Sequence, residues 1–235
     1  MTVSSAHSPL EVTADDGSRL VAYDVVDGRH PHLAEVMASL HRRAFPDHLF
    51  AADEIIADAA RPSRRDQVVV HQWLLTRNDE PVGYSLADSN LRRRVAPIHF
   101  LAIEPAVRSV VVGGVGIGGW FLHDALRQYL VDAGEPGLGC VAETPEYKLP
   151  IFHRYGWRVF DVPYREPVHG WRWQTEGLDT RDVALIWLPP DDGPHLGIEA
   201  DAARAAAAAF LIDKYRVDPD IEWVRALVTD QPRLR

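Results

Sequence analysis

A cluster of glycines between a β-branched run and a helical run constrains this chain more than any other feature. It spans Val110 to Leu122 and has the sequence VVVGGVGIGGWFL. Glycines at a strand–helix junction let backbone N–H groups approach an anion closely. The helix N-terminus adds unsatisfied N–H groups and the positive end of its dipole. The stretch therefore predicts a diphosphate-binding site, and the order of the other elements must decide which architecture carries it.

Length and composition indicate a globular protein. A chain of 235 residues, 46% hydrophobic and 25% charged, can form one domain with a sizeable core. No apolar run is long enough to span a membrane, and Met1–Pro9 has no signal-peptide core. We therefore expect a cytoplasmic protein that does not contact a membrane.

Charge and cysteine content exclude several classes of function. The single cysteine, Cys140, rules out an internal disulfide and a metal site built on thiolates, and we expect no metal. A net charge of −9 argues against nucleic-acid binding and suits a cationic small substrate. Lys148 and Lys214 are the only lysines among 25 basic residues, which is typical of a GC-rich genome and favours a bacterial source.

Hydrophobic periodicity predicts a mixed α/β chain. Residues 1–17 form a polar tail in this prediction, and a linker precedes a C-terminal helical segment. We expect strands over 19–26, 67–76, 81–87, 97–103, 138–143, 157–162 and 182–188, and helices over 31–45, 53–60, 115–131, 149–155, 199–215 and 222–229. Antiparallel hairpins with one parallel crossover predict a mixed, mostly antiparallel sheet flanked by helices.

One interpretation of the glycine cluster is a dinucleotide fingerprint. Residues 114–119 match G-x-G-x-x-G, Val110–Val112 would be the preceding strand, and Glu143 stands where a ribose-binding acid would be expected. That interpretation makes the protein a flavin- or nicotinamide-dependent oxidoreductase. A doubly wound domain needs several further strand–helix units, however, and only about forty-five residues follow Glu143 before the linker.

The order of elements over residues 19–188 resembles the GNAT family of N-acetyltransferases. Pro97–Ile103, followed by Arg108 and the glycine turn, is similar to the family's strand and (Q/R)-x-x-G-x-(G/A) turn. Residues 151–157, IFHRYGW, resemble its F-Y-x-x-x-G-F segment, and residues 80–84, EPVGY, resemble its x-x-V-G-x hairpin strand. The resemblance implies an acyl-CoA N-acyltransferase domain over residues 18–190, with a C-terminal helical extension over 191–235.

The same resemblance implies transfer of an acetyl or other short acyl group from coenzyme A to a small-molecule amine. It assigns the coenzyme to the strand end, the glycine turn and the short helix after the next strand. The residues concerned are Leu101, Ala102, Ile103, Arg108, Gly113, Gly114, Val115, Gly116, Ile117, Gly118, Gly119 and Phe152.

The chain departs from the family pattern at three positions. Gly113 occupies the place of the usual Gln or Arg, Phe152 that of the tyrosine acid, and Pro97 that of the glutamate base. The last two departures favour an alternative, in which the protein is a non-catalytic acyl-CoA sensor or partner module of the same fold.

Two residues are candidates for general base catalysis. His99 lies on the apolar strand and has an ordinary pKa suited to neutral pH, although a lone strand histidine also fits a core position. Glu143 ends the next strand and would take the amine's proton directly or through water; it would equally cap the following helix. Tyr147, His153 and Tyr155 are substitutes for the missing acid.

The long connection over residues 163–179 predicts a substrate-binding loop. Its Trp171 and Trp173 would line an acceptor pocket, or would alternate along an edge strand that covers the core. The run Arg92–Arg94 fits solvated charge. The C-terminal helices would pack on the domain or form a homodimer interface.

Overall fold

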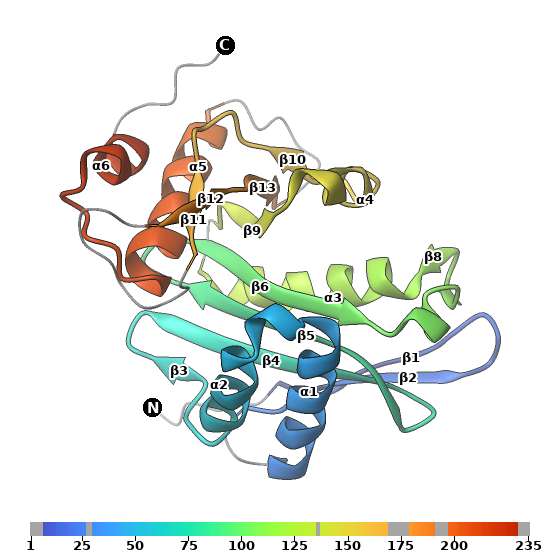
Figure 1. The fold of residues 1–235 in the computed structure, drawn as a ribbon. Helices are drawn as coiled ribbons and strands as arrows, with labels where there is room; N and C mark the ends of the chain where they lie inside the picture. Colours follow the sequence, from blue (N-terminus) through green and yellow to red (C-terminus); the bar gives the residue numbers. More distant parts are fainter. Residues whose placement is uncertain (1–6, 27–29, 135–136, 169–178, 191–196, 230–235) are drawn as a thin grey trace. The chain divides into compact units, whose positions relative to one another are not determined.

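The computed structural model describes residues 7–26, 30–134, 137–168, 179–190 and 197–229. The chain divides into two compact units (Figure 1). Unit 1 comprises Met1–Asp88 and His99–Tyr129, and unit 2 comprises Ser89–Ile98 and Leu130–Arg235. Strands β5 and β6 and helix α3 run from one unit into the other, so each unit is described through the portions that belong to it.

Unit 1 is an antiparallel sheet with helices. Its elements in chain order are β1 (Leu10–Thr13), β2 (Arg19–Asp24), α1 (Pro31–Ala44), the 3-10 turn η1 (Pro46–His48), α2 (Phe50–Ala59), β3 (Arg64–Arg65), β4 (Val68–Arg77), β5 (Glu80–Asn90), β6 (Val95–Ile103), the 3-10 turn η2 (Pro105–Val107), β7 (Val111–Val112), β8 (Val115–Gly116) and α3 (Ile117–Asp132).

Local chemistry sets several of these boundaries. Pro31 stands at the first turn of α1, where its missing N–H costs nothing. Asn78 and Asp79 have φ values of 49° and 68°, so β4 and β5 meet in a two-residue turn of the type that favours tight hairpins. Strand β2 pairs antiparallel with β1 through Leu10↔Ala22 and with β4 through Val21↔Thr76.

The two faces of the unit 1 sheet carry different helices. Helices α1 and α2 bury Met37 and Ile55 against Leu74 of β4 and Tyr84 of β5. Ser85, the next residue of β5, accepts a hydrogen bond from the Tyr129 hydroxyl of α3 at 3.2 Å. Because successive strand side chains point to opposite faces, α1 and α2 cover one face and α3 the other.

Unit 2 contains the parallel pairing. After the first residues of β6 and the last of α3, its elements are β9 (Gly139–Thr144), the 3-10 turn η3 (Glu146–Lys148), α4 (Leu149–His153), β10 (Arg158–Val159), β11 (Arg165–Pro167), β12 (Thr180–Asp182), β13 (Ala184–Leu188), α5 (Glu199–Ala208), the π-helical turn η4 (Ala209–Lys214) and α6 (Glu222–Thr229).

Among the registers of the described strands, only β6 with β9 is parallel, from Val95↔Gly139 to Ile98↔Ala142. Strand β13 lies antiparallel to both β9 and β10, and β11 pairs antiparallel with β12. The α/β fold with a mixed, mostly antiparallel sheet is therefore confirmed. It excludes the doubly wound domain that a dinucleotide-dependent oxidoreductase would need.

The C-terminal helices belong to the core of unit 2. Trp187 of β13 stacks on Phe160 with ring centroids 5.5 Å apart and donates its indole N–H to the Leu138 carbonyl at 2.7 Å. The same core holds the fully buried Phe210 and Leu211 of η4. A glycine is required at Gly139, because its φ is +118° and an added Cβ would lie 2.3 Å from the Trp187 indole nitrogen.

Three local predictions need correction. Residues Leu10–Thr13, expected in a polar tail, form edge strand β1, since Leu10 and Val12 alternate with polar residues. The expected helix over 199–215 changes to a π-helical turn after Ala208. Arg93, expected to be solvated, pairs with Asp213 at 3.0 Å.

Among the described residues, every helix is too short or too polar to cross a membrane.

Candidate functional site

The glycine cluster folds into a small hairpin that leads into α3. Strands β7 and β8 pair through Val111↔Gly116 and Val112↔Val115. Gly113 and Gly114 form the turn, with φ values of 55° and 84° that require glycine or a similarly permissive residue. Val110–Val112 is thus one arm of this hairpin, whereas a dinucleotide fingerprint would need a long strand running directly into the helix.

An aspartate from the β1–β2 turn binds the tip of this hairpin. The Gly113 N–H donates to one carboxylate oxygen of Asp15 at 2.8 Å, and the Gly114 N–H donates to the other at 3.3 Å. The Asp15 N–H donates in turn to the Val111 carbonyl at 2.9 Å. A diphosphate that used these two glycine amides would have to displace a carboxylate, so their main contribution here is to the turn.

The first turn of α3 is the better anion site. The Ile117 N–H donates to the Val110 carbonyl at 2.8 Å, which leaves the next amides, those of Gly118 and Gly119, as the helix's unsatisfied N-terminal donors. An added Cβ at Gly116 would meet nothing within 4 Å, and the neighbouring Val115 is 47% exposed. The approach to this helix end therefore passes over open backbone.

The end of β6 lies directly before this loop. Leu101, Ala102 and Ile103 are each half-buried, and Arg108 donates from Nε to the Ile103 carbonyl at 3.0 Å. A Cβ at Gly83 of β5 would lie 2.7 Å from the Ala102 carbonyl oxygen. The glycine of the EPVGY segment is therefore required for a structural reason, since only a residue without a Cβ permits this close approach of β5 to β6.

His99, one of the two candidate bases, has a carboxylate partner. Its Nε2 lies 2.8 Å from Asp88 Oδ2, and the two side chains are 10% and 20% exposed. Asp88 of β5 would hold the imidazole in one orientation, as carboxylates do in histidine-dependent sites. Sequence reasoning missed Asp88, because no local motif marks which residue of β5 lies opposite His99.

Glu143, the other candidate base, lies at the centre of a polar cluster in unit 2. Both of its carboxylate oxygens accept hydrogen bonds from tyrosine hydroxyls, Oε1 from Tyr164 and Oε2 from Tyr215. The Tyr215 hydroxyl also lies 3.5 Å from Oε1 of Glu166, and Arg181 donates from Nε to Oε2 of Glu166 at 2.5 Å. We call these five residues the Glu143 cluster.

Burial sets the protonation of Glu143. Desolvation, reinforced by the nearby charge of Glu166, raises its pKa to about 8, against the lowering effect of the two tyrosine hydrogen bonds and of Arg181. Burial also raises the pKa of Tyr164 and of Tyr215 well above their ordinary value, so both hydroxyls keep their protons. The alternative role of Glu143 as a helix cap is not seen, because Pro145 precedes η3 and no side chain caps that turn.

The segment that resembles F-Y-x-x-x-G-F forms α4 and the turn after it. Phe152 is half-buried, with its ring centroid 5.5 Å from that of Trp157. His153 Nδ1 lies 3.1 Å from the Trp157 carbonyl oxygen. Tyr147 and Tyr155, the substitutes for the missing acid, are 77% and 41% exposed.

Trp171 and Trp173 lie outside the described residues, so their acceptor role stays a prediction. The described parts of the 163–179 connection are its two ends. They include the buried Tyr164 and strand β11, which pairs with β12 just after the connection. The first residues of this connection therefore supply Tyr164 and Glu166 to the Glu143 cluster. Sequence reasoning identified Glu143 and the connection but missed Glu166, Arg181 and Tyr215, which no local motif marks.

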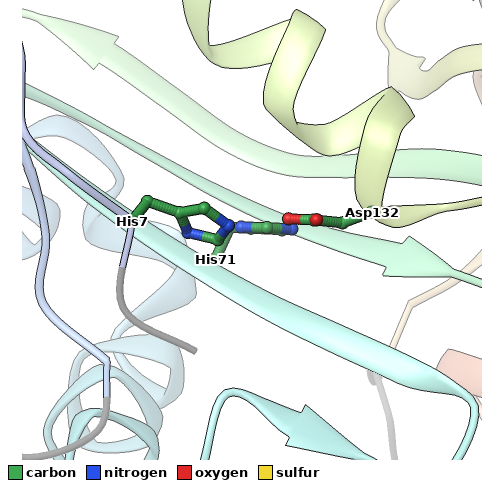
Figure 2. A group of neighbouring side chains, drawn as sticks. All are labelled: His7, His71 and Asp132. Carbon is green, nitrogen blue, oxygen red and sulfur yellow. The ribbon is translucent and has the colours of Figure 1, made fainter. Parts of the chain in front are cut away.

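His7 and His71 form a separate histidine group in unit 1 (Figure 2). Their ring centroids are 5.2 Å apart, and Nδ1 of His7 lies 2.8 Å from Oδ2 of the buried Asp24. Asp132, the third residue in that figure, ends α3 and belongs to unit 2. The expected lack of a metal stays a prediction.

Comparison with known proteins shows a likeness of fold. No family model matches the chain, and no curated protein matches its sequence. The crystal structure of aminoglycoside 6'-acetyltransferase type Ii matches with a TM-score of 0.50 and 16% identity, over 74% of this chain and 99% of that one.

Two further solved structures have lower TM-scores. An aminoglycoside 6'-N-acetyltransferase complexed with coenzyme A matches at 0.48 with 15% identity, over 73% of this chain and 99% of that one. An acetyltransferase of the GNAT family from Streptococcus pneumoniae matches at 0.48 with 18% identity, over 72% and 99%. The chain has the fold of the GNAT acetyltransferases, with C-terminal helices.

Proposed function

We propose that this protein transfers an acetyl or other short acyl group from coenzyme A to the amine of a small molecule. The observation that carries this proposal is the open N-terminus of α3, placed directly after β6 by the glycine hairpin. Proteins of similar fold are named as acetyltransferases, and one of them is complexed with coenzyme A. A diphosphate at a helix N-terminus is stabilised by unsatisfied N–H groups and by the helix dipole.

In this proposal the coenzyme binds along unit 1. Gly118 and Gly119 donate backbone N–H groups to the diphosphate, and Gly116 leaves room for it. The backbone of Leu101–Ile103 holds the pantetheine arm. Arg108 supports that strand end through the Ile103 carbonyl. Gly113 and Gly114 shape the hairpin, while contacts from Val115, Ile117 and Phe152 rest on the family resemblance.

A protonated amine must lose two protons to become an amide nitrogen. It cannot attack the thioester while protonated, so a base removes the first proton before nitrogen bonds to the acyl carbon. The C–S bond then breaks, and the coenzyme leaves as a thiolate that takes up the second proton from the nitrogen. Glu143 is the base we favour, because a pKa of about 8 lies near physiological pH, where a general base works best. His99, oriented by Asp88, is the second candidate.

A coenzyme-binding experiment tests the site. Gly116→Val adds a side chain where the diphosphate approaches. The protein itself leaves space there, so the fold should survive while acetyl-CoA affinity falls at least tenfold. Isothermal titration would measure the affinity and a melting curve the stability. Gly137→Val serves as the matched control, since an added Cβ at Gly137 meets only ordinary contacts at 3.6 Å or more. Normal binding by a folded Gly116→Val protein would refute the assignment.

A turnover experiment tests the reaction and the base. The protein is incubated with acetyl-CoA and a panel of small amines, and the release of free thiol is followed over time. Glu143→Gln should retain coenzyme affinity and lower turnover by about 10² or more. If His99→Gln lowers turnover and Glu143→Gln does not, the base is His99. Tight acetyl-CoA binding without turnover on any amine would favour the sensor alternative, which the departures at Phe152 and Pro97 motivate.

A further inference from the structure

The C-terminal segment contributes a side chain to the Glu143 cluster. This segment follows the part of the chain that resembles the acetyltransferase family. Tyr215, which follows η4 directly, is 8% exposed and directs its hydroxyl to Oε2 of Glu143. A residue 72 positions further along the chain therefore binds the carboxylate that we propose as the base.

The backbone holds Tyr215 firmly at this place. Its N–H donates to the Phe210 carbonyl at 2.8 Å, and the rings of Tyr215 and Phe210 stack with centroids 6.4 Å apart. Arg216 then takes a left-handed conformation with φ of 59°, which ends the helix, and the Val217 N–H returns to the Leu211 carbonyl at 2.8 Å. The position of the hydroxyl is thus set by the fold of η4 and its buried neighbours.

The charged and titratable groups around Glu143 come from several elements of unit 2. Tyr164 precedes β11, Glu166 lies on β11, Arg181 lies on β12 and Tyr215 follows η4. Strand β13 contributes the apolar Leu185 opposite Glu143 in the register. Each carboxylate oxygen of Glu143 therefore has one tyrosine donor, and Tyr215 also lies between the two carboxylates.

We propose that Tyr215 is a positioning residue for acyl transfer, which orients the Glu143 carboxylate and favours its ionised form through a hydrogen bond from the C-terminal segment. This inference rests on the proposed function, with Glu143 as the base. The C-terminal segment is then part of the catalytic apparatus of the domain. Loss of the Tyr215 hydroxyl removes a donor that favours the carboxylate, so the pKa of Glu143 should rise further.

The test compares three variants that each remove one buried hydroxyl. Tyr215→Phe keeps the ring and its stacking on Phe210, and should move the ascending limb of kcat/KM against pH upward by roughly half to one pH unit. Tyr164→Phe should move it in the same direction. Tyr129→Phe is the matched control, because the Tyr129 hydroxyl is buried against Ser85 in unit 1, and it should leave the profile unchanged.

A second measurement separates this inference from the proposed function. NMR titration of ¹³C-labelled glutamate side chains, with the Glu143 signal assigned by its loss in Glu143→Gln, follows the carboxyl group without any turnover. The pKa of Glu143 should rise in Tyr215→Phe and fall in Glu166→Gln, because the Glu166 charge raises it. Absence of turnover with every amine would refute the proposed function, whereas an unchanged Glu143 titration in Tyr215→Phe would refute the role of Tyr215.

If Tyr215→Phe does not fold, 3-fluorotyrosine placed at position 215 alone keeps both ring and hydroxyl. Fluorination makes the hydroxyl a stronger donor, so the pKa of Glu143 should then fall, opposite to the effect of removing the hydroxyl. An unchanged Glu143 titration in that protein would equally overturn the proposal.

Discussion

At the scale of single residues, the central feature is a glutamate that burial makes basic. Each carboxylate oxygen of Glu143 accepts a hydrogen bond from a tyrosine hydroxyl, yet desolvation and the charge of Glu166 raise its pKa to about 8. Two tyrosine hydroxyls and the Arg181–Glu166 pair act in the same cluster. Perturbed titratable groups of this kind gather at functional sites, although structural networks also produce them.

The raised pKa of Glu143 predicts how stability depends on pH. The folded-state pKa of about 8 lies above the ordinary value of 4.5, so the folded protein binds more protons than the unfolded chain between these values. The contribution of Glu143 to stability is therefore fully present below pH 4.5 and is lost as pH rises through 8. Between pH 5 and 8, the melting temperature of the wild type should fall more steeply than that of Glu143→Gln.

Thermal melts at several pH values would measure this difference. The exposed Glu146, three residues further along, supplies the control, and Glu146→Gln should keep the slope of the wild type. Parallel slopes for wild type and Glu143→Gln would show that the carboxyl group of Glu143 titrates at its ordinary value.

At the scale of elements, the glycines of the loop between β6 and α3 have two different structural roles. Gly113 and Gly114 make the turn of the β7–β8 hairpin, and Asp15 binds their amides. Gly116 leaves open space beside the N-terminus of α3. The β7–β8 hairpin is therefore held in place by another turn of unit 1. Because Asp15 occupies the amides of Gly113 and Gly114, the proposed diphosphate site uses those of Gly118 and Gly119 instead.

At the scale of the whole molecule, each unit has its own core, and the C-terminal helices are part of one of them. Phe210 and Leu211 are fully buried with Trp187, Phe160 and Val141 in the core of unit 2. The Asp213 carboxylate of η4 binds Arg93 and Asn90 at the turn before β6. The segment after residue 199 therefore stabilises the strands that precede it.

Truncation of Phe210 tests this dependence. Phe210→Ala should reduce the free energy of unfolding by about 3–5 kcal/mol, because it removes a fully buried aromatic ring and leaves a cavity. A loss of that size is a large share of a typical domain's stability. Chemical denaturation would measure it, with Tyr147→Ala as the control, since Tyr147 is 77% exposed and its loss should change stability by less than about 0.5 kcal/mol. A loss of less than about 1 kcal/mol in Phe210→Ala would show that unit 2 does not depend on its C-terminal segment.

Most of the architecture could be predicted from the sequence because it depends on local patterns. Period-2 alternation placed the main strands, the helical period placed α1 and α3, and the turn-forming residues between the strands over 67–76 and 81–87 indicated a hairpin. Strand β1 escaped prediction because its four residues lie in a polar context and gain their order from pairing with β2. The hairpin of β7 and β8 escaped because two-residue strands carry no periodicity.

The candidate site likewise has parts that the sequence predicts and parts that only the tertiary structure determines. The sequence by itself determined the glycine-rich approach to α3, the positions of His99 and Glu143 and the order of elements, since each depends on residue type and neighbours along the chain. Tertiary structure alone decided that Asp15 occupies two of the glycine amides, that Asp88 faces His99, and that Tyr215 reaches Glu143. These partners lie 98, 11 and 72 residues apart, and such contacts arise only when folding brings together strands and turns that no local pattern connects.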